Sequence, residues 1–150
     1  IVVLTVPAAH QISTLDALKD HLKGKILIDV TVPLVPPKVG TVQLPEEGSA
    51  GKRAQDFLGE EVHVVSAFQN IAAHLLQQDV VIECDVLVAG NSKDSRAKVI
   101  EMISEAGMTG WHAGPIANAA AAEALTSILI QINRGGILSH SGIKIIGQEH

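Results

Sequence analysis

The stretch Lys25–Pro33, KILIDVTVP, decides the fold class of this chain. It is an apolar run that stops at Val32-Pro33, and the chain opens in the same way with IVVLTVP, which stops at Val6-Pro7. Such runs are typical of parallel strands buried on both faces. A single Val-Pro pair predicts only the end of a strand, because proline has no N–H for the ladder. Two pairs in matching positions predict a shared sheet edge at the carboxyl ends of the strands, where open α/β sheets bind ligands.

The composition of the 150 residues fits one α/β domain with a substantial core. Hydrophobic residues make up 47% but aromatic residues only 2%, so the core is built from Val, Ile, Leu and Ala. The net charge of −5, without a basic cluster, argues against nucleic acid or an anionic membrane as partner. The apolar stretch 117–132 is interrupted by polar residues and predicts no transmembrane span. The single cysteine, Cys84, and the lack of a secretory signal predict a cytoplasmic protein.

Strand and helix patterns alternate along the chain. Strands are expected at residues 1–6, 25–32, 62–67, 84–89 and 110–113, with a last short strand at 142–147. Helices are expected at 10–23, 49–58, 70–77, 94–106 and 116–134, and the proline-rich segment 35–49 is expected to be a surface loop. This order predicts a Rossmann-like, doubly wound and mostly parallel sheet. The last helix has an apolar stripe wide enough to pack in its own core or against a second subunit, which predicts a homodimer.

A nicotinamide-binding sheet usually has a glycine-rich turn between its first strand and helix. The sequence contains neither GxGxxG nor GxxxxGK[ST]. Because Ile1 already belongs to a strand pattern, we expect an N-terminal βαβ part with that turn to precede it. The same absence is equally expected of a protein that never bound a dinucleotide.

Several segments closely resemble the bacterial NADPH-dependent reductases of the deazaflavin coenzyme F420. The segments are KILIDVTVPLVPP (25–37), VVSAFQNIAAHLL (64–76), CDVLVAGNSKDSRAKVIEMI (84–103), AGPIANAAAAEALTSILIQINR (113–134) and GIKI (142–145). The match begins at what would be the fourth strand of that family's dinucleotide fold. The resemblance implies hydride transfer between NADPH and F420. It also implies that residues 1–150 are the C-terminal part of one Rossmann-like domain together with its deazaflavin-binding portion.

The resemblance further implies positions for the two cofactors. It places the two strand ends Val6-Pro7 and Val32-Pro33, here called the Val-Pro corners, near NADP together with Ala73. It places Ser141 against the deazaflavin, where the family often has an apolar residue. Gln69 stands where archaeal members have a histidine, and we expect the Gln69 and Asn70 amides to read the carbonyl edge of a ring. The predicted cofactor-binding residues are Val6, Pro7, His10, Val32, Pro33, Gln69, Asn70, Ile71, Ala73 and Ser141.

No catalytic side chain is expected, because in hydride transfer the cofactors carry the reactive centres and the protein orients them. The seven histidines are scattered without HExxH spacing or a CxxC, so no metal site is predicted. His10 is expected either to touch a cofactor or to stand as a polar residue at a helix start. Asp29 and Asp85 are expected at strand ends, facing a pocket or simply lying at the sheet edge. Cys84 is expected in the core rather than as a nucleophile.

Two other functions fit the same sequence. An NADP-dependent reductase could use another small acceptor, with the dinucleotide fold unchanged. A truncated, non-catalytic domain could serve only for dimerisation or for binding a partner.

Overall fold

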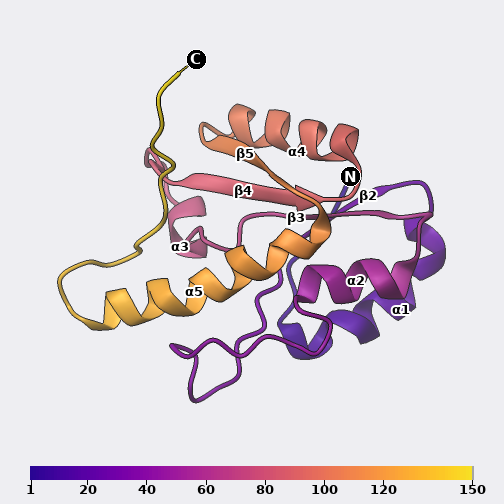
Figure 1. The fold of residues 1–150 in the computed structure, drawn as a ribbon, viewed down its shortest axis with the longest axis horizontal. Coiled ribbons are helices and arrows are strands. Elements are labelled where there is room, and N and C mark those ends of the chain that lie inside the picture. The colour runs from indigo at the N-terminus through magenta and orange to yellow at the C-terminus, as the bar shows by residue number, and fades with distance from the viewer. Residues whose placement is uncertain (150) are drawn as a thin grey trace.

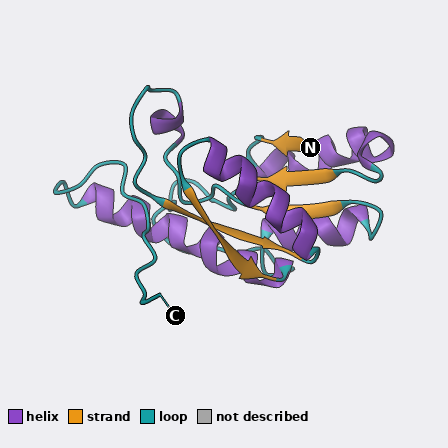
Figure 2. Ribbon diagram, turned by 90° about the horizontal axis from the view of Figure 1, so that it is seen from above, coloured by secondary structure: helices purple, strands orange, loops and turns teal. Residues whose placement is uncertain are grey.

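The computed structural model describes residues 1–149 as a five-stranded sheet with helices on both faces (Figures 1 and 2). The strands are β1 (Val2–Leu4), β2 (Ile26–Asp29), β3 (His63–Ser66), β4 (Asp85–Gly90) and β5 (Thr109–Gly114). The α-helices are α1 (Gln11–Leu22), α2 (Ala50–Leu58), α3 (Ala73–Leu76), α4 (Lys93–Glu105) and α5 (Ala119–Arg134). Two 3₁₀ turns, η1 (Ala8–His10) and η2 (Ile116–Asn118), precede α1 and α5.

The strands lie in chain order across the sheet. The β1–β2, β2–β3 and β4–β5 pairs are parallel, whereas β4 runs antiparallel to β3. The predicted Rossmann-like, mostly parallel sheet is therefore confirmed, and β4 is the strand that departs from the parallel direction. To pair in parallel with β3, β4 would have to start at the amino end of β3, so the chain would first have to return along the face of the sheet. The single turn of α3 does not span that distance, and β4 therefore starts at the carboxyl end of β3 and runs antiparallel to it.

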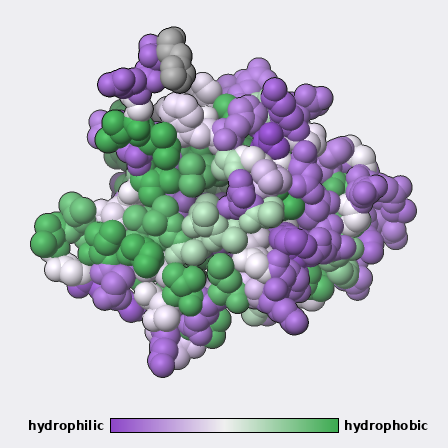
Figure 3. Space-filling view, in the orientation of Figure 1, coloured by the Kyte–Doolittle hydropathy of each residue, from purple (hydrophilic) through white to green (hydrophobic). Residues whose placement is uncertain are grey.

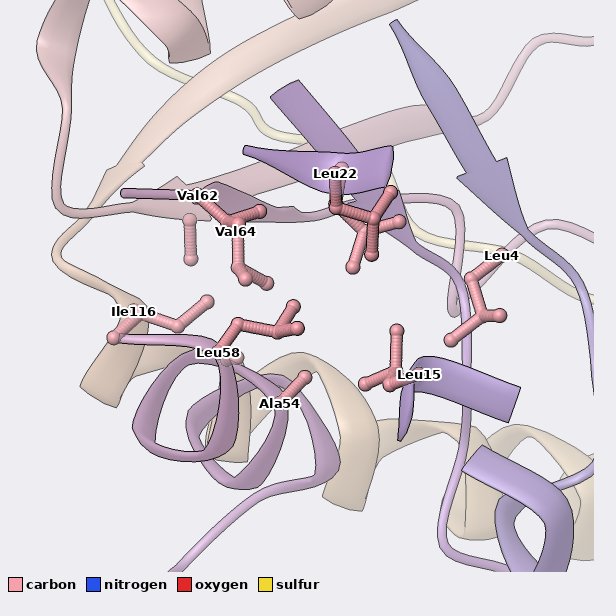
Figure 4. Close-up of a cluster of buried hydrophobic side chains, with 11 residues drawn as sticks. Leu4, Leu15, Leu22, Ala54, Leu58, Val62, Val64 and Ile116 are labelled. Carbon is pink, nitrogen blue, oxygen red and sulfur yellow. The ribbon is translucent and has the colours of Figure 1, made fainter. Parts of the chain in front are cut away.

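Each face of the sheet buries its own apolar core. Figure 1 shows α1, α2 and α5 on one side of the sheet and α4 on the other. The first core includes Leu15 and Leu22 of α1 and Leu58 of α2, packed against the strands (Figure 4). Along β2, Leu27 enters the first core and Ile28 enters the second, and both are fully buried. This alternation explains why the strand has no polar side: both of its faces are covered by helices.

Most element bounds agree with the sequence patterns to within one or two residues. The Ser49 hydroxyl accepts a hydrogen bond from Lys52 N at 2.9 Å and so caps the start of α2. Gly59 ends this helix with a φ of 74°, a conformation that glycine adopts without strain.

Some predicted elements are shorter. Strand β1 ends at Leu4 and β2 at Asp29, and of the helix expected at 70–77 only Ala73–Leu76 forms. The β2 ladder stops because the Asp29 carboxylate turns back to accept a hydrogen bond from Thr31 N at 2.9 Å. The helix expected at 116–134 begins as η2 and becomes α-helical at Ala119.

The predicted strand at 142–147 is wrong. The segment runs beside the start of β4, where Asp85 N donates to Ile143 O at 2.8 Å. The next donor of the segment, Ile145 N, goes to the Asp85 carboxylate at 2.8 Å instead of to a backbone carbonyl. A side chain thus takes the place of the second ladder bond, and regular pairing ends.

Cys84 lies just before β4 and is half-buried against the second core, rather than inside a strand. Burial raises the pKa of its thiol, and the neighbouring Asp85 and Glu83 carboxylates raise it further. The thiol is therefore held in its protonated, weakly nucleophilic form.

Within residues 1–149, the structure contains neither a membrane-spanning helix nor a cluster of metal ligands. No helix in this part of the chain is long and apolar enough to cross a bilayer. No group of three or more His, Cys, Asp and Glu side chains in the same range could hold a metal ion.

A buried carboxylate joins α5 to the start of α2. Glu123 is only 1% exposed, and its side chain accepts hydrogen bonds from Ala50 N at 2.6 Å and Gly51 N at 3.3 Å. These two N–H groups lie in the first turn of α2, where backbone N–H groups have no carbonyl acceptor within the helix. Burial nevertheless dominates and raises the pKa of Glu123 to about 7, with the Asp29 charge adding to the rise and the two backbone hydrogen bonds opposing it.

This shift predicts a pH-dependent stability. A carboxyl whose pKa is raised in the folded state binds its proton more tightly there, so the free energy of unfolding falls as the pH rises from 4.5 to about 7. The shift corresponds to a loss of about 3 kcal/mol across that window. We expect Glu123→Gln to flatten this dependence in urea denaturation measured between pH 4.5 and 8. The exposed Glu101→Gln of α4 is the control and should retain the slope; equal slopes in all three proteins would contradict the assignment.

A second prediction concerns the β3–β4 pair. A Cβ at Gly90 would lie 2.9 Å from Val64 O, a backbone atom that cannot move without distorting the sheet. We expect Gly90→Ala to lower the free energy of unfolding by about 1–3 kcal/mol in urea denaturation. Gly147→Ala, whose Cβ would meet nothing within 4 Å, should be neutral. A neutral Gly90→Ala would show that the two strands separate more easily than this contact implies.

Candidate functional site

The carboxyl ends of β1, β2 and β3 meet at one edge of the sheet. Leu4, Asp29 and Ser66 are register partners across the three strands. Both Val-Pro corners follow directly, so the predicted shared edge is confirmed. This edge positions every candidate residue described below.

Asp29 holds this edge together. Its carboxylate is fully buried and accepts hydrogen bonds from Gln11 Nε2 at 2.6 Å and from Thr31 N at 2.9 Å. Arg53 Nε in turn donates to Gln11 Oε1 at 2.8 Å. Burial raises the pKa of Asp29, while the hydrogen bonds from Thr31 and Gln11 and the charge of Arg53 act against the rise. Of the two roles expected for Asp29, the structure thus supports the strand-end role: its side chain binds the protein and lines none of the cavities described here.

A cavity of about 630 Å³ lies against the second-core side of this edge. Its walls come from the ends of β1 and β2, the segment after β3, and α4. Most of its lining is aliphatic or thioether, including Val3, Val32, Ile71, Leu76, Met102 and Met108. Such a lining suits a flat, uncharged ring, because it offers dispersion contacts and excludes water.

A smaller cavity of about 150 Å³ lies between the segment after β3, α5 and the C-terminal segment. Its lining includes Asn70, Asn133 and Ser141. Gln69, Ile71 and Thr126 line both cavities and therefore form the partition between them.

The partition is held in an unusual backbone conformation. Phe68 has a φ of 72°, which for a bulky residue costs about 1–3 kcal/mol. Three hydrogen bonds hold the residues that follow: Thr126 Oγ1 donates to Gln69 O at 2.7 Å, and Asn70 Nδ2 donates to Ala122 O at 2.8 Å and to Thr126 Oγ1 at 3.2 Å. These bonds tie the partition to α5 and fix the side chains that face the two cavities.

The ten predicted cofactor-binding residues do not form one cluster. Val32, Gln69, Ile71 and Ala73 line the larger cavity. The smaller cavity is lined by Gln69, Asn70, Ile71 and Ser141. Pro33 lines a third cavity, of about 440 Å³, beside Arg53. Val6, Pro7 and His10 lie at the same edge but line none of the cavities described.

Three other polar side chains lie at the ends of helices and strands. His10 precedes α1 at the N-cap position, yet its imidazole makes no capping hydrogen bond. Asn118, at the N-cap position of α5, makes no capping hydrogen bond and donates to Ala113 O at 2.7 Å. Asp85 pairs with Trp111, whose Nε1 donates to its carboxylate at 2.9 Å, so both residues hold the edge of the sheet.

Sequence reasoning missed Phe68 and Thr126. Thr126 lies in the apolar stripe of α5, and a hydroxyl in such a stripe was the signal that could have marked it. The strained backbone of Phe68 left no signal, because φ is set by the tertiary contacts around it.

No family model matches the chain. Several curated proteins, however, are similar to it in sequence. The chain is 33% identical to the F420-dependent NADP reductase of Methanocaldococcus jannaschii, over 99% of this chain and 69% of the relative. It is 36% identical to the F420-dependent NADP reductase of Methanothermobacter thermautotrophicus, over 97% of this chain and 65% of that relative.

Solved structures agree with these relatives. A putative F420-dependent NADP reductase from Arthrobacter sp. FB24 superposes with a TM-score of 0.84 at 26% identity, covering 98% of this chain and 69% of that one. A hypothetical protein from Sinorhizobium meliloti has a TM-score of 0.66 at 21% identity over 79% of this chain and 58% of its own, and shares the fold.

The chain spans about two thirds of the length of these curated relatives, with coverages of 69% and 65%. The resemblance to the F420 reductases noted in the sequence is therefore confirmed, over nearly the whole of the chain. With 33% identity to a curated member and more than two thirds of that member covered, this chain belongs to the family of F420-dependent NADP reductases.

Proposed function

We propose that this chain takes part in hydride transfer between NADPH and the oxidised deazaflavin coenzyme F420, as an oxidoreductase with NADP and F420 as its cofactors. Family membership supports the activity and both cofactors. The observation that carries the proposal is the pair of adjoining cavities at the carboxyl edge, with Gln69 and Ile71 in the partition between them.

The chemistry of the lining fits such a reaction. When bound, the two cofactors supply the hydride donor and acceptor, and transfer requires their reacting atoms to come within about 3–3.5 Å of each other. The residues around the larger cavity would hold a ring by its faces and exclude water. No acid or base from the chain is required for this role.

We assign the two cavities to the two cofactors. Val32, Ile71 and Ala73 would contact the nicotinamide in the larger cavity, where the reacting faces of both rings would meet, and Asn70 and Ser141 would contact only the far edge of the deazaflavin at the smaller one. The smaller cavity has room for only about five water molecules, so it would admit one edge of a tricyclic ring. We place Val6, Pro7, His10 and Pro33 along the path of the rest of NADP, because they follow the same strand ends.

Two alternatives remain testable: a different small acceptor, and a non-catalytic role in dimerisation or partner binding. Nothing in the site favours either over F420. We expect NADPH to bleach the absorbance of oxidised F420 in the presence of the full-length protein. An absence of bleaching, with NADPH oxidised by another acceptor, would replace F420 in the proposal, and an absence of all NADPH oxidation would support the non-catalytic reading.

A size substitution tests the larger cavity. Ala73 is exposed at its rim, so Ala73→Phe should fold while filling space that a ring needs. We expect kcat/KM for NADPH to fall by about 100-fold, the effect of displacing a reacting ring by roughly 1 Å. Ala121→Phe, on the exposed side of α5 and outside all described cavities, should leave kcat/KM within about twofold. Equal losses in both variants would contradict the assignment of this cavity to NADP.

We also propose a homodimer through the C-terminal half of α5 and the segment after it. Figure 3 shows hydrophobic surface gathered on the side where these elements lie. The exposed apolar residues there are Ile128, Ile132, Ile137, Leu138, Ile145 and Ile146. A patch of this kind on a protein surface commonly marks an interface, and a second copy is its commonest occupant. The single cysteine and the net charge of −5 support a cytoplasmic protein that does not bind nucleic acid.

Charge substitution tests the dimer. Ile128→Glu with Ile132→Glu should convert the protein to monomers, because a desolvated carboxylate opposes association. Light scattering measured with size-exclusion chromatography would report the mass of each form. Val81→Glu, which changes a residue that is 86% exposed between α3 and β4, should leave the mass unchanged. An unchanged mass in the double variant would place any interface elsewhere.

A further inference from the structure

The side-chain amide of Gln69 has only one possible orientation. Gln69 is 6% exposed, and its Nε2 donates to Asp29 O at 2.8 Å. A backbone carbonyl can only accept a hydrogen bond, so nitrogen must face Asp29 and oxygen must face the other way. Because the partition backbone is tied to α5, the amide cannot turn over without breaking this bond.

The Gln69 Oε1 atom is buried and receives no hydrogen bond within residues 1–149. The side-chain donors of Asn70 and Thr126 are already used: Asn70 Nδ2 binds Ala122 O and Thr126 Oγ1, and the Thr126 hydroxyl donates to Gln69 O. Buried acceptors without a donor are rare in folded proteins, because they lose the hydrogen bonds that water offers.

Two other buried oxygens share this condition, the hydroxyls of Thr31 and Ser66. Neither lines any of the cavities described, whereas Gln69 lines both the larger and the smaller one. Gln69 therefore combines an unused acceptor, its Oε1 atom, with a position beside the proposed binding sites of the nicotinamide and the deazaflavin.

We propose that Gln69 is a positioning and specificity residue whose Oε1 accepts a hydrogen bond from an N–H group of a bound ring. This inference rests on the proposed function. It also reverses the sequence expectation for Gln69, since a free acceptor recognises a donor and not the carbonyl edge of a ring. The oxygen is screened from solvent, so the ligand's N–H reaches it by displacing neighbouring side chains, a common adjustment on binding.

Two ligands offer this chemistry: the carboxamide of nicotinamide and the imide N–H of the deazaflavin. Each has an analogue without the donor, namely NADP with an acetyl group in place of the carboxamide, and a deazaflavin methylated at the imide nitrogen. The dissociation constants of the two parent ligands and the two analogues would be measured by fluorescence or calorimetry with the wild type and with Gln69→Met. For each protein, the Kd of an analogue divided by that of its parent reports the hydrogen bond alone, because general damage to binding cancels.

We expect one analogue to bind the wild type about 5- to 20-fold more weakly than its parent, and Gln69→Met to bring this ratio close to one. The analogue that shows this loss identifies the ring that Gln69 recognises. Thr126→Val removes a support of the partition and is the matched control: it should weaken parent and analogue equally and keep the wild-type ratio.

Ratios that are the same in the wild type and in Gln69→Met for both ligand pairs, with the parents still bound, would overturn this inference and leave the proposed function standing. Failure of the wild type to bind either parent ligand would overturn both. A ratio that falls equally in Thr126→Val would also overturn it, because loss of support alone would then explain the result.

Discussion

The buried carboxylate of Asp29 is the interaction on which the rest of this structure depends. It ends β2, turns the chain toward the second Val-Pro corner, and receives Gln11 of α1. Gln11 in turn binds Ala50 O of α2 at 2.8 Å and is itself bound by Arg53. One acidic group thus connects the sheet edge to two helices that are distant in the sequence. A carboxylate this deeply buried is stable only with such partners.

A second buried acid completes the arrangement. Ala50 accepts from Gln11 through its carbonyl and donates to Glu123 through its N–H, so the Asp29 and Glu123 networks meet at one residue. Burial raises the pKa of both carboxyls, and the negative charge of Asp29 contributes to the rise at Glu123. The start of α2 is therefore fixed from β2 on one side and from α5 on the other. That frame holds α5 in place, and α5 holds the partition through Thr126 and Ala122.

The cavities follow from this frame and from the strain at Phe68. The left-handed backbone there turns the chain sharply out of β3, so that Gln69 and Ile71 stand between two spaces. Such strain persists only where surrounding contacts over-determine the conformation, as the bonds from Thr126 and Asn70 do here. The lining of the larger space is mostly aliphatic, so this side of the edge offers shape and dispersion contacts rather than polar groups.

Some of the site could be predicted from the sequence. The Val-Pro corners lie at the sheet edge that they predicted, and four of the predicted residues, Gln69, Asn70, Ile71 and Ala73, line the cavities beside it. The division of these residues between two cavities could not be predicted, because it depends on how α5 and the C-terminal segment pack on them. The free acceptor of Gln69 was also beyond the sequence, since which end of an amide is used is decided by its neighbours.

The sequence by itself determined the fold class, most of the element bounds and the family. Apolar runs and turn residues are local properties, and their order along the chain is set by the sequence alone. Only the tertiary structure decided the direction of β4, the lengths of β1 and β2, and the irregular path of residues 142–147. In each case the outcome was set by a contact between distant residues, such as Asp85 with Ile145, and a local pattern contains no information about such a contact.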